Sequence, residues 1–539
     1  MKTWGPLVIL AAAQFLMVLD QAVMNVSISQ LVADFDTTVT TIQAVITLYS
    51  LTMAMLMVTG GKIGDLIGRR RAFIIGLAIY ACGSGLTAAS QSVFTLTLGW
   101  SVLEGIGAAL VLPALAALIA GNYEGKARVV AYSVIGGVAG AGIAVGPIVG
   151  GWATTELSWR VVFVGEVVIV LAILALIRML GDAPGPERRP HLDYVGSVLS
   201  AAGLGLIVYG FLQASTWGWV SPKSSPVTPF GFSLTPFVIA AGGAVLWLFV
   251  VWQHERVKRD KDPLIHLELF RLPPLRSGLQ TFLAQNLILM GVFFTVPLYL
   301  QMVLGLNALD TGIKMLPVSV AMFLAAVAGP RLSQQFSTRG IVRVGLAIVT
   351  AGVFGLLASI DPELNGATFA VSMALLGVGM GLIASQLGNV VQSSVDASGR
   401  SEAGGLQYTA QQLGSAIGVA LIGAIVLTGL VGNFTAAITA DPRIDPKVAA
   451  QATANANANA SFVPASTVEK AATDSGLDAA TVDAFVTSYE DAQLFALKSG
   501  LLAAAAIALA ALLFTKYLPN KVPDPEAEPA SPDSTALSP

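Results

Sequence analysis

The chain is poor in charged residues, in cysteine and in histidine. Only 11% of its 539 residues are charged, against roughly 25% in a soluble domain, and 55% are hydrophobic. The single cysteine, Cys82, excludes an intramolecular disulfide and a cysteine-based metal site, and His191, His254 and His266 all fall in polar connections. We therefore predict an integral membrane protein with no metal site and no cofactor. The net charge of -3 gives no reason to expect a nucleic-acid partner.

Fourteen apolar runs are each long enough, at about 20 residues, to cross a bilayer. The predicted spans cover 6–29, 41–61, 72–90, 94–120, 129–151, 161–180, 195–214, 234–252, 279–304, 311–329, 341–360, 367–388, 406–431 and 494–517. If both termini are cytoplasmic, the inner loops receive about three times as many Lys and Arg residues as the outer loops, as the positive-inside rule requires. We therefore predict a multi-pass protein of the plasma (inner) membrane with both termini in the cytoplasm.

A polar and basic segment, 61–71 with the sequence GKIGDLIGRRR, separates the second and third spans. Such a segment cannot lie in hydrocarbon, so we expect a short cytoplasmic loop whose glycines permit tight turns. Its aspartate can pair with the arginines or with a helix N-terminus. The segment resembles the G-x-x-x-D-x-x-G-R-[KR]-[KR] loop of the major facilitator superfamily of transporters. This resemblance implies a conformational hinge. Its expected residues are Gly61, Gly64, Asp65, Gly68, Arg69 and Arg70.

The first span carries an acid, Asp20, on a polar and methionine-rich face, opposite an apolar face. A carboxylate costs about 2.5–3.5 kcal/mol at the centre of a span, so we expect an aqueous cavity beside it. The residues of this span expected to line the cavity are Gln14, Met17, Gln21, Met24 and Asn25. The run LDQAVMNVS resembles the first-span signature of fourteen-span drug:proton antiporters, which implies that Asp20 is a protonation site. A helix-packing role for Asp20 is the alternative.

Two more acids lie inside predicted spans. In span four, LTLGWSVLEGIGAALVLPA resembles the family's R-x-x-Q-G-x-G motif, with Ser101 in place of the arginine and Glu104 in place of the glutamine. Without that buried cation, Glu104 is either a proton carrier or a permanently protonated structural acid. In span six, Glu166 stands where the family usually has asparagine. It is either a third proton-coupling acid, or a group that is hydrated near the outer surface or paired with Arg160.

Span five contains GIAVGPIVGG, which matches G-x-x-x-G-P-x-x-G-G and resembles the antiporter motif of exporters. Glycines four residues apart permit close helix packing, and the proline bends the span. A plain packing motif is the alternative. The motif residues are Gly142, Gly146, Pro147, Gly150 and Gly151.

The second half of the chain lacks acids inside its spans. Neutral polar side chains could line an uncharged half of the cavity there, and a structural role is the alternative for each of them. These residues are Tyr299, Gln301, Gln386, Gln407 and Gln411.

The resemblance covers nearly the whole chain and implies an all-α membrane protein with the major facilitator fold: two six-helix bundles and an inserted helix pair. The predicted units are an N-terminal bundle (1–180), a cytoplasmic linker (181–193), two inserted helices (194–253), a second linker (254–276), a C-terminal bundle (277–517) with an external loop (432–493), and a disordered tail (518–539). In the external loop we expect a flexible or weakly helical Ala/Asn tract. A short surface helix would follow, started by a capping box from Ser466 to Glu469.

The resemblance also implies a secondary active efflux transporter, which exports amphipathic or hydrophobic compounds, cations among them, by proton antiport through alternating access. Its partners are then the small molecule, protons and the lipid bilayer. One alternative is a dedicated exporter of a lipid or another envelope metabolite, with unusual or absent proton coupling and an envelope partner at the external loop. A membrane-embedded enzyme or a non-transporting sensor is a further alternative. An enzyme is disfavoured, because the spans contain no histidine, cysteine pair or Ser/His arrangement.

Overall fold

The computed structural model describes residues 4–123, 125–182, 191–395, 399–458 and 461–520, and every regular element among them is a helix. Fourteen helical segments are long and apolar enough to cross a membrane, which confirms the predicted number. These segments are α1 (Gly5–Val26), α3 (Val39–Ile67), α4 (Arg69–Ala88), α5–η1–α6 (Val93–Leu96, Thr97–Glu104 and Gly105–Asn122), α7 (Gly125–Glu156), α8 (Trp159–Leu176), α9 (Tyr194–Trp217), α10 (Thr235–Lys258), α11–η5 (Pro273–Leu298 and Tyr299–Val303), α12 (Ala308–Leu332), α13 (Thr338–Ser359), α14 (Gly366–Ser393), α15 (Arg400–Ala440) and α18 (Ala479–Phe514). Shorter elements connect them: α2 (Ile28–Asp34), η2 (Ile177–Met179), η3 (Pro229–Gly231), η4 (Leu267–Arg271), α16 (Pro446–Ala458), α17 (Ala465–Asp474) and η6 (Thr515–Tyr517).

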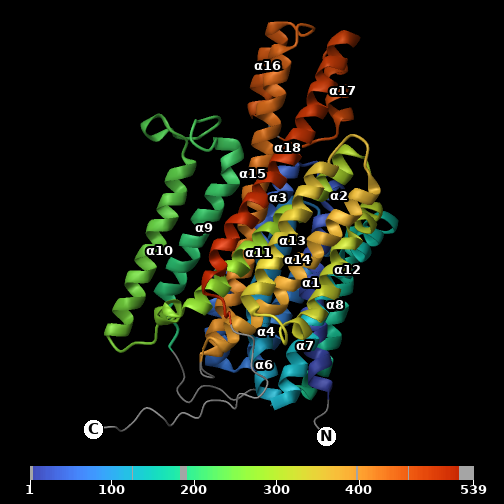
Figure 1. Ribbon diagram of the computed structural model, residues 1–539. Coiled ribbons are helices and arrows are strands. Elements are labelled where there is room, and N and C mark those ends of the chain that lie inside the picture. Colours follow the sequence, from blue (N-terminus) through green and yellow to red (C-terminus); the bar gives the residue numbers. More distant parts are fainter. Residues whose placement is uncertain (1–3, 124, 183–190, 396–398, 459–460, 521–539) are drawn as a thin grey trace, which may run out of the picture.

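The helices run between two opposite faces of the molecule (Figure 1). We call the end that carries the segment 61–71 and the connection 259–272 the hinge face. The opposite end, with residues 27–38 and helices α16 and α17, is the loop face. Helix α1 begins at the hinge face and α18 returns to it, as an even number of spans requires.

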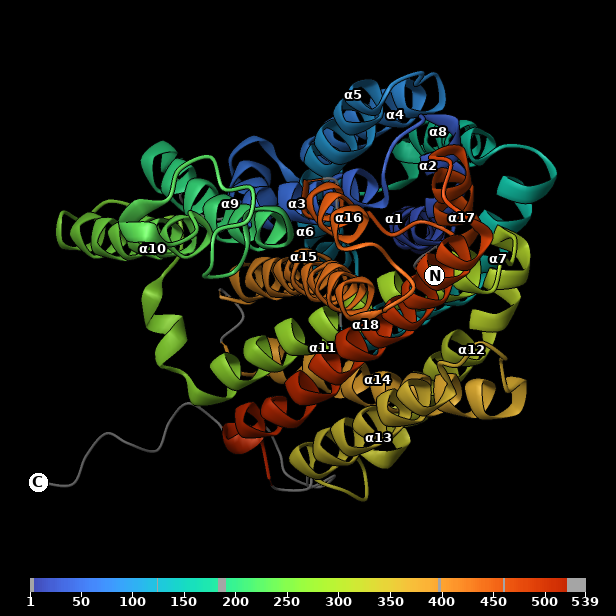
Figure 2. The ribbon, with the colours of Figure 1, turned by 90° about the horizontal axis from the view of Figure 1, so that it is seen from above.

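Helices α9 and α10 form a separate pair at the side of the bundle (Figure 2). Helix α9 packs against α3 and α15, whereas α10 packs mainly against α9. Only 17% of the apolar stretch of α10 is buried inside the protein, so most of its surface faces the bilayer. Asp193 begins the pair by accepting the Gly196 N–H at 2.9 Å. This arrangement explains why two polar linkers bracket the pair in the sequence.

The loop-face end of the C-terminal region is more helical than the sequence predicts. Helices α15 and α18 contain 41 and 36 residues and continue well past the predicted span limits, while α16 and α17 project beyond the rest of the bundle (Figure 1). The predicted capping box is wrong. Helix α17 begins at Ala465 after Pro464, and no side chain caps its first turn. Of the predicted linker and tail, residues 183–190 and 521–539 lie outside the described part of the chain.

The halves α1–α8 and α11–α18 are joined by hydrogen bonds at mid-height and toward the loop face. At the loop face, Gln301 donates to the Val26 carbonyl at 2.9 Å and accepts from the Ser29 hydroxyl, and the Leu309 N–H donates to Thr155 at 3.1 Å. At mid-height the bonds are Gln21 to Gln412, Gln43 to Val419, and Ser319 to Ile143. In the described part of the chain, hydrogen bonds therefore hold the two halves together on the side of the loop face.

Candidate functional site

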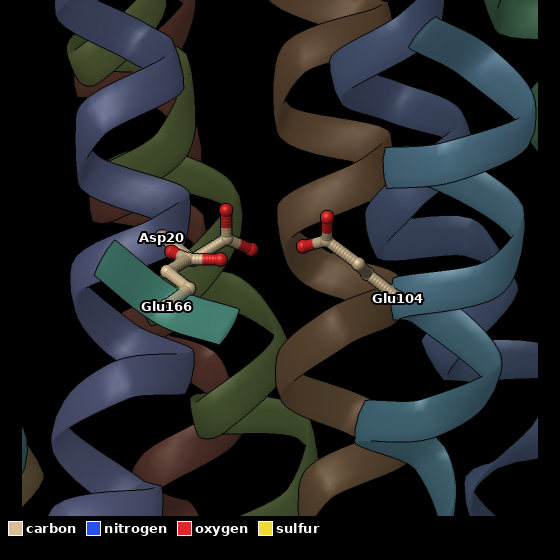
Figure 3. A group of neighbouring side chains, drawn as sticks. All are labelled: Asp20, Glu104 and Glu166. Atoms are coloured by element: carbon tan, nitrogen blue, oxygen red, sulfur yellow. The ribbon is translucent and has the colours of Figure 1, made fainter. Parts of the chain in front are cut away.

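Three acids that are far apart in the sequence meet in the interior of the bundle. Asp20 comes from α1, Glu104 from the end of η1 and Glu166 from α8, and their exposed fractions are 0%, 0% and 1%. One oxygen of each carboxyl group lies within 4.8 Å of the other two (Figure 3). We call these residues the acid cluster. Two alternatives for Glu166 are therefore wrong, because it is neither hydrated at the surface nor paired with Arg160, which binds Asp34 instead at 3.0 Å.

Each acid of the cluster accepts hydrogen bonds from neighbouring helices. The indole N–H of Trp100 donates to Asp20 Oδ1 at 2.8 Å, and the Thr87 hydroxyl donates to Glu104 Oε1 at 3.1 Å. Glu166 Oε2 accepts from Ser84 at 3.0 Å and from Tyr80 at 3.2 Å. Three of these four donors lie on α4, so α4 holds two of the acids in place from one side.

The second oxygen of each acid is buried without a partner: Asp20 Oδ2, Glu104 Oε2 and Glu166 Oε1. None of the ion pairs among the described residues includes an acid of the cluster. Two unit charges 4.8 Å apart repel by about 3 kcal/mol at an effective dielectric constant of about 20, so three uncompensated carboxylates would be strongly unfavourable. Protons or a bound cation must therefore balance the cluster. Among the described residues, only these three acids have the spacing to hold a metal ion.

The altered motif of span four has a local structural explanation. Thr97–Glu104 form a π-helix, a geometry that often occurs at functional sites, and Glu104 ends it. Ser101 is fully buried, and its hydroxyl donates to the Val45 carbonyl of α3 at 2.8 Å. Ser101 of span four thus packs closely against α3, at a position where the longer side chain of an arginine would need extra space.

The first-span residues predicted to line a cavity are mostly buried in this conformation. Gln14, Met17, Met24 and Asn25 are between 0% and 6% exposed, and half-buried Gln21 donates to Gln412 of α15 at 3.1 Å. These side chains of the described first span therefore do not face an open aqueous cavity in this conformation. Gln412, which no sequence motif indicates, is a residue of α15 that contacts span one.

The predicted lining residues of the second half lie in different surroundings. Tyr299 donates to the Asp361 carbonyl at 2.7 Å, and Gln386 donates to the Gly329 carbonyl at 3.2 Å, so both contacts lie within the C-terminal half. Gln301 instead bridges the two halves. Gln407 and Gln411 are half-exposed on α15. The structure does not bring these five residues together with the acid cluster.

The hinge segment joins α3 to α4 through one residue, Gly68, whose φ of 98° favours glycine. Asp65 and Arg69 form the predicted ion pair one turn apart. Arg70 reaches the end of span six by donating to the Ile177 carbonyl at 3.0 Å. Gly61 and Gly64 have ordinary packing distances, whereas their neighbour Gly60 faces the Ala109 carbonyl so closely that a Cβ would overlap it. The close helix approach therefore depends on Gly60, which the motif did not indicate.

The glycines of the span-five motif contact two different helices. Gly142, Gly146 and Gly150 face α1 at Val18, Ala22 and Val23, where added Cβ atoms would be crowded or would overlap. Gly151 faces α12, and a Cβ there would lie 2.5 Å from the Ala308 carbonyl oxygen. Pro147 lies inside α7, and its carbonyl is close to Gly312 of α12. The motif thus packs α7 against the helix that carries Asp20 and against the opposite half of the protein.

Outside the spans, Asp34 and Arg160 form an ion pair at the loop face. Burial of Asp34 would raise the pKa of its carboxyl group, but hydrogen bonds from Trp159, Gln30 and Arg160 outweigh this effect and lower the pKa below its usual value. Arg160 also lies 4.4 Å from the centre of the Trp159 ring. These contacts hold α2 against the start of α8.

At the hinge face, His266 contacts Glu402 of α15. Its Nδ1 lies 2.9 Å from the Glu402 carboxylate, which also accepts the His266 backbone N–H. The Glu402 hydrogen bond raises the pKa of His266 above its usual value, against opposing effects of burial and of Lys62. No sequence pattern indicates this contact, because 136 residues separate the two partners.

Residues 10–419 match the family model of the Major Facilitator Superfamily. The chain is 28% identical to the tetracenomycin C resistance and export protein of Streptomyces glaucescens, over 80% of this chain and 77% of that one. It is 30% identical to the multidrug efflux pump LfrA of Mycolicibacterium smegmatis, over 79% and 81%, and 30% identical to a probable actinorhodin transporter of Streptomyces coelicolor, over 82% and 75%. A solved bacterial homologue of the human lysosomal transporter Spinster has a similar fold, with a TM-score of 0.59, 14% identity and coverage of 96% and 98%.

The chain therefore belongs to the major facilitator superfamily, whose members are membrane transporters and not enzymes. It is a multi-pass transporter of small molecules with fourteen candidate spans and the fold of that superfamily. Because the relatives are bacterial, the plasma membrane is its location.

Proposed function

We propose that this transporter exports amphipathic or hydrophobic compounds, cations among them, from the cytoplasm in exchange for protons. The names of its relatives support export, since they include an antibiotic resistance and export protein and a multidrug efflux pump. The buried acid cluster is the observation that carries the proton coupling. Without a basic partner in any described ion pair, Asp20, Glu104 and Glu166 need protons or a cationic substrate whenever the bundle closes around them.

The cluster offers a simple means of exchange. When the bundle opens to one side, water and substrate reach the acids, and protons leave. When it closes, the charge must be balanced again, so a proton or a positively charged substrate accompanies the change of state. Each proton charge that moves inward gains about 2.3 kcal/mol per 100 mV of membrane potential, which can drive export against a gradient.

We assign the hinge face to the cytoplasm, with both chain termini on that side. The excess of Lys and Arg in the loops of this face supports the assignment. The conformation with its halves joined toward the loop face is then closed to the outside. Alternating access would require the hydrogen bonds of Gln301 to break and Gly151 to move away from Ala308. We keep the predicted units 1–180, 194–253 and 277–517 as the parts that move or anchor in this cycle.

The test uses purified protein in liposomes that contain a pH-sensitive dye. A gradient of ethidium is imposed, and lumenal pH is recorded for the wild type, Asp20→Asn and Glu104→Gln. We expect ethidium-driven proton movement in the wild type and its loss in Asp20→Asn. Asp193→Asn is the matched control, because Asp193 is also buried but lies at the start of the inserted pair, where it accepts a hydrogen bond from Gln253. Ethidium movement without protons in the wild type would disprove antiport.

A dedicated exporter of a lipid or envelope metabolite is a second candidate. The observation in its favour is the long projection of α16 and α17, anchored by the Arg443–Asp483 ion pair at 3.1 Å between the ends of α15 and α18. A short Gly/Ser linker in place of 441–478 tests it. Loss of one envelope component with unchanged drug sensitivity would support the dedicated exporter, whereas unchanged envelope composition would leave drug export as the function.

A further inference from the structure

Tyr49 of α3 lies against the acid cluster, although no motif points to it. The residue is 1% exposed, and its hydroxyl is buried without a well-formed hydrogen bond in this conformation. An unpartnered buried hydroxyl costs free energy, on the order of 1–3 kcal/mol, and is uncommon in folded proteins. The cost of this buried hydroxyl beside the acid cluster suggests that Tyr49 has a function there.

The ring of Tyr49 is held in a fixed position. It stacks on Trp100 with ring centres 4.5 Å apart and an angle of 5° between the planes. Trp100 itself donates to Asp20, so the two aromatic rings and the acid form one packed unit from α3, η1 and α1. The Tyr49 hydroxyl interacts with the Asp20 carboxyl, and the charges of Glu104 and Glu166 also act on it.

Among the described residues, three other hydroxyl groups form hydrogen bonds with acids of the cluster. Thr87 donates to Glu104, and Ser84 and Tyr80 both donate to Glu166. The Tyr49 hydroxyl, in contrast, interacts with Asp20 but has no well-formed hydrogen bond in this conformation. Asp20 Oδ2 and Glu104 Oε2 are acceptors that also have no partner. Tyr49, Asp20 and Glu104 therefore each have a buried polar atom without a well-formed hydrogen bond, and both acids act electrostatically on the Tyr49 hydroxyl.

We propose that Tyr49 relays a proton between Glu104 and Asp20, an inference that rests on the proposed proton antiport. In the relay, the phenol gives its proton to the Asp20 carboxylate while its oxygen receives the proton of the Glu104 carboxylic acid. One O–H bond breaks and one forms at the phenol, so the phenol is restored. Glu104 becomes a carboxylate, Asp20 becomes a carboxylic acid, and no other reactant is needed. The relay would connect Glu104, the acid of the altered span-four motif, with Asp20 of span one.

Tyr49→Phe removes the hydroxyl and keeps the ring that stacks on Trp100. In the liposome assay with ethidium, we expect at least a tenfold fall in the maximal rate of substrate-driven proton movement, with an unchanged KM for ethidium. Thermal stability in detergent should stay equal or rise, because an unpartnered buried hydroxyl is lost. The matched control is Tyr123→Phe, which removes a buried phenol that accepts the Leu7 N–H at 3.0 Å at the hinge-face end of α6.

A double variant separates a relay from a packing role. If Tyr49 acts through Glu104, adding Tyr49→Phe to Glu104→Gln should cause no further loss of rate. Independent losses in the two variants, or a wild-type maximal rate in Tyr49→Phe, would overturn the relay while leaving antiport intact. A wild type that moves ethidium without protons would instead overturn both the antiport and the relay.

Discussion

The indole of Trp100 donates a 2.8 Å hydrogen bond to Oδ1 of Asp20 and thereby joins span four to span one inside the acid cluster. Both side chains are buried, at 1% and 0% exposed. The same indole stacks on Tyr49. Trp100 therefore controls the orientation of the carboxyl group that the first-span signature indicates as the protonation site.

Trp100→Phe tests this relationship. Phenylalanine keeps a ring against Tyr49 but cannot donate, so a buried carboxyl oxygen loses its partner and we expect a loss of about 1–3 kcal/mol in folding free energy. We also expect substrate-driven proton movement to slow, because the Asp20 carboxyl is free to turn away. Thermal unfolding in detergent and the liposome dye assay measure the two effects.

Trp252→Phe is the control for Trp100→Phe. Trp252 donates to the buried carboxyl of Asp193 at 3.0 Å, so its loss removes the same kind of bond in the inserted helix pair. This variant should be less stable but should still couple ethidium to protons. Equal coupling defects in both variants would show that general instability, and not the orientation of Asp20, is responsible.

The sequence was sufficient to predict the spans, because hydrocarbon thickness sets a minimum apolar length that all fourteen satisfy. It also identified each acid of the cluster separately. It could not bring Glu166 to Asp20, since helical periodicity places a residue on a face of its own helix but says nothing of which helix packs there. The polar donors of α4 were missed for the same reason: Ser84 and Thr87 are ordinary residues until Glu166 and Glu104 lie opposite them.

Other predictions failed where the tertiary structure overrides a local pattern. The capping box at Ser466 has suitable spacing, but the helix starts one residue earlier, after Pro464, so the serine cannot cap it. As a polar side chain in an apolar run, Gln301 is predicted to line the cavity. Its partners, Val26 and Ser29, are more than 270 residues away in the sequence, so its position between the two halves was not predictable.

Gly151→Ala should shift the transporter away from the conformation closed at the loop face. The new Cβ would lie 2.5 Å from the Ala308 carbonyl, and a backbone atom packed in a helix cannot yield easily. Spin labels on the exposed positions Glu156 and Asp310, in a Cys82→Ser background, would report a longer mean distance. Gly136→Ala is the control, because nothing lies within 4 Å of its Cβ position. An unchanged distance in Gly151→Ala would show that α7 and α12 do not form the outer closure.

Gln301→Leu should make the protein leak protons. The variant loses the bond to the Val26 carbonyl at 2.9 Å and the contact with Ser29, both of which join the two halves near the loop face. Without substrate, an imposed pH gradient across proteoliposomes should collapse several times faster than with the wild type. Gln285→Leu is the control, because it loses a comparable bond to the Met380 carbonyl within one half of the protein. Its rate of proton leak should equal that of the wild type. A wild-type leak rate in Gln301→Leu would show that Gln301 is not needed to keep the loop face closed to protons.

His266 should make the stability of the hinge face depend on pH. The Glu402 carboxylate raises the pKa of His266 above its ordinary value of about 6.5, with a smaller favourable contribution from Asp262 and an opposing one from Lys62. A raised pKa in the folded state means that the stabilisation is complete below about pH 6.5 and disappears as the pH rises through the higher folded value. The difference in melting temperature between wild type and His266→Gln should therefore be largest near pH 6 and shrink toward pH 8.5.

Glu402→Gln provides the matched background for the His266 experiment. With the carboxylate gone, the neutral amide can still accept a hydrogen bond but no longer favours the charged imidazole, so His266→Gln should cost nearly the same at every pH. The backbone N–H of His266, which also binds Glu402, is present in all four proteins and does not affect the comparison. A pH-dependent difference that persists in the Glu402→Gln background would assign the effect to Asp262, the other acid that acts on His266.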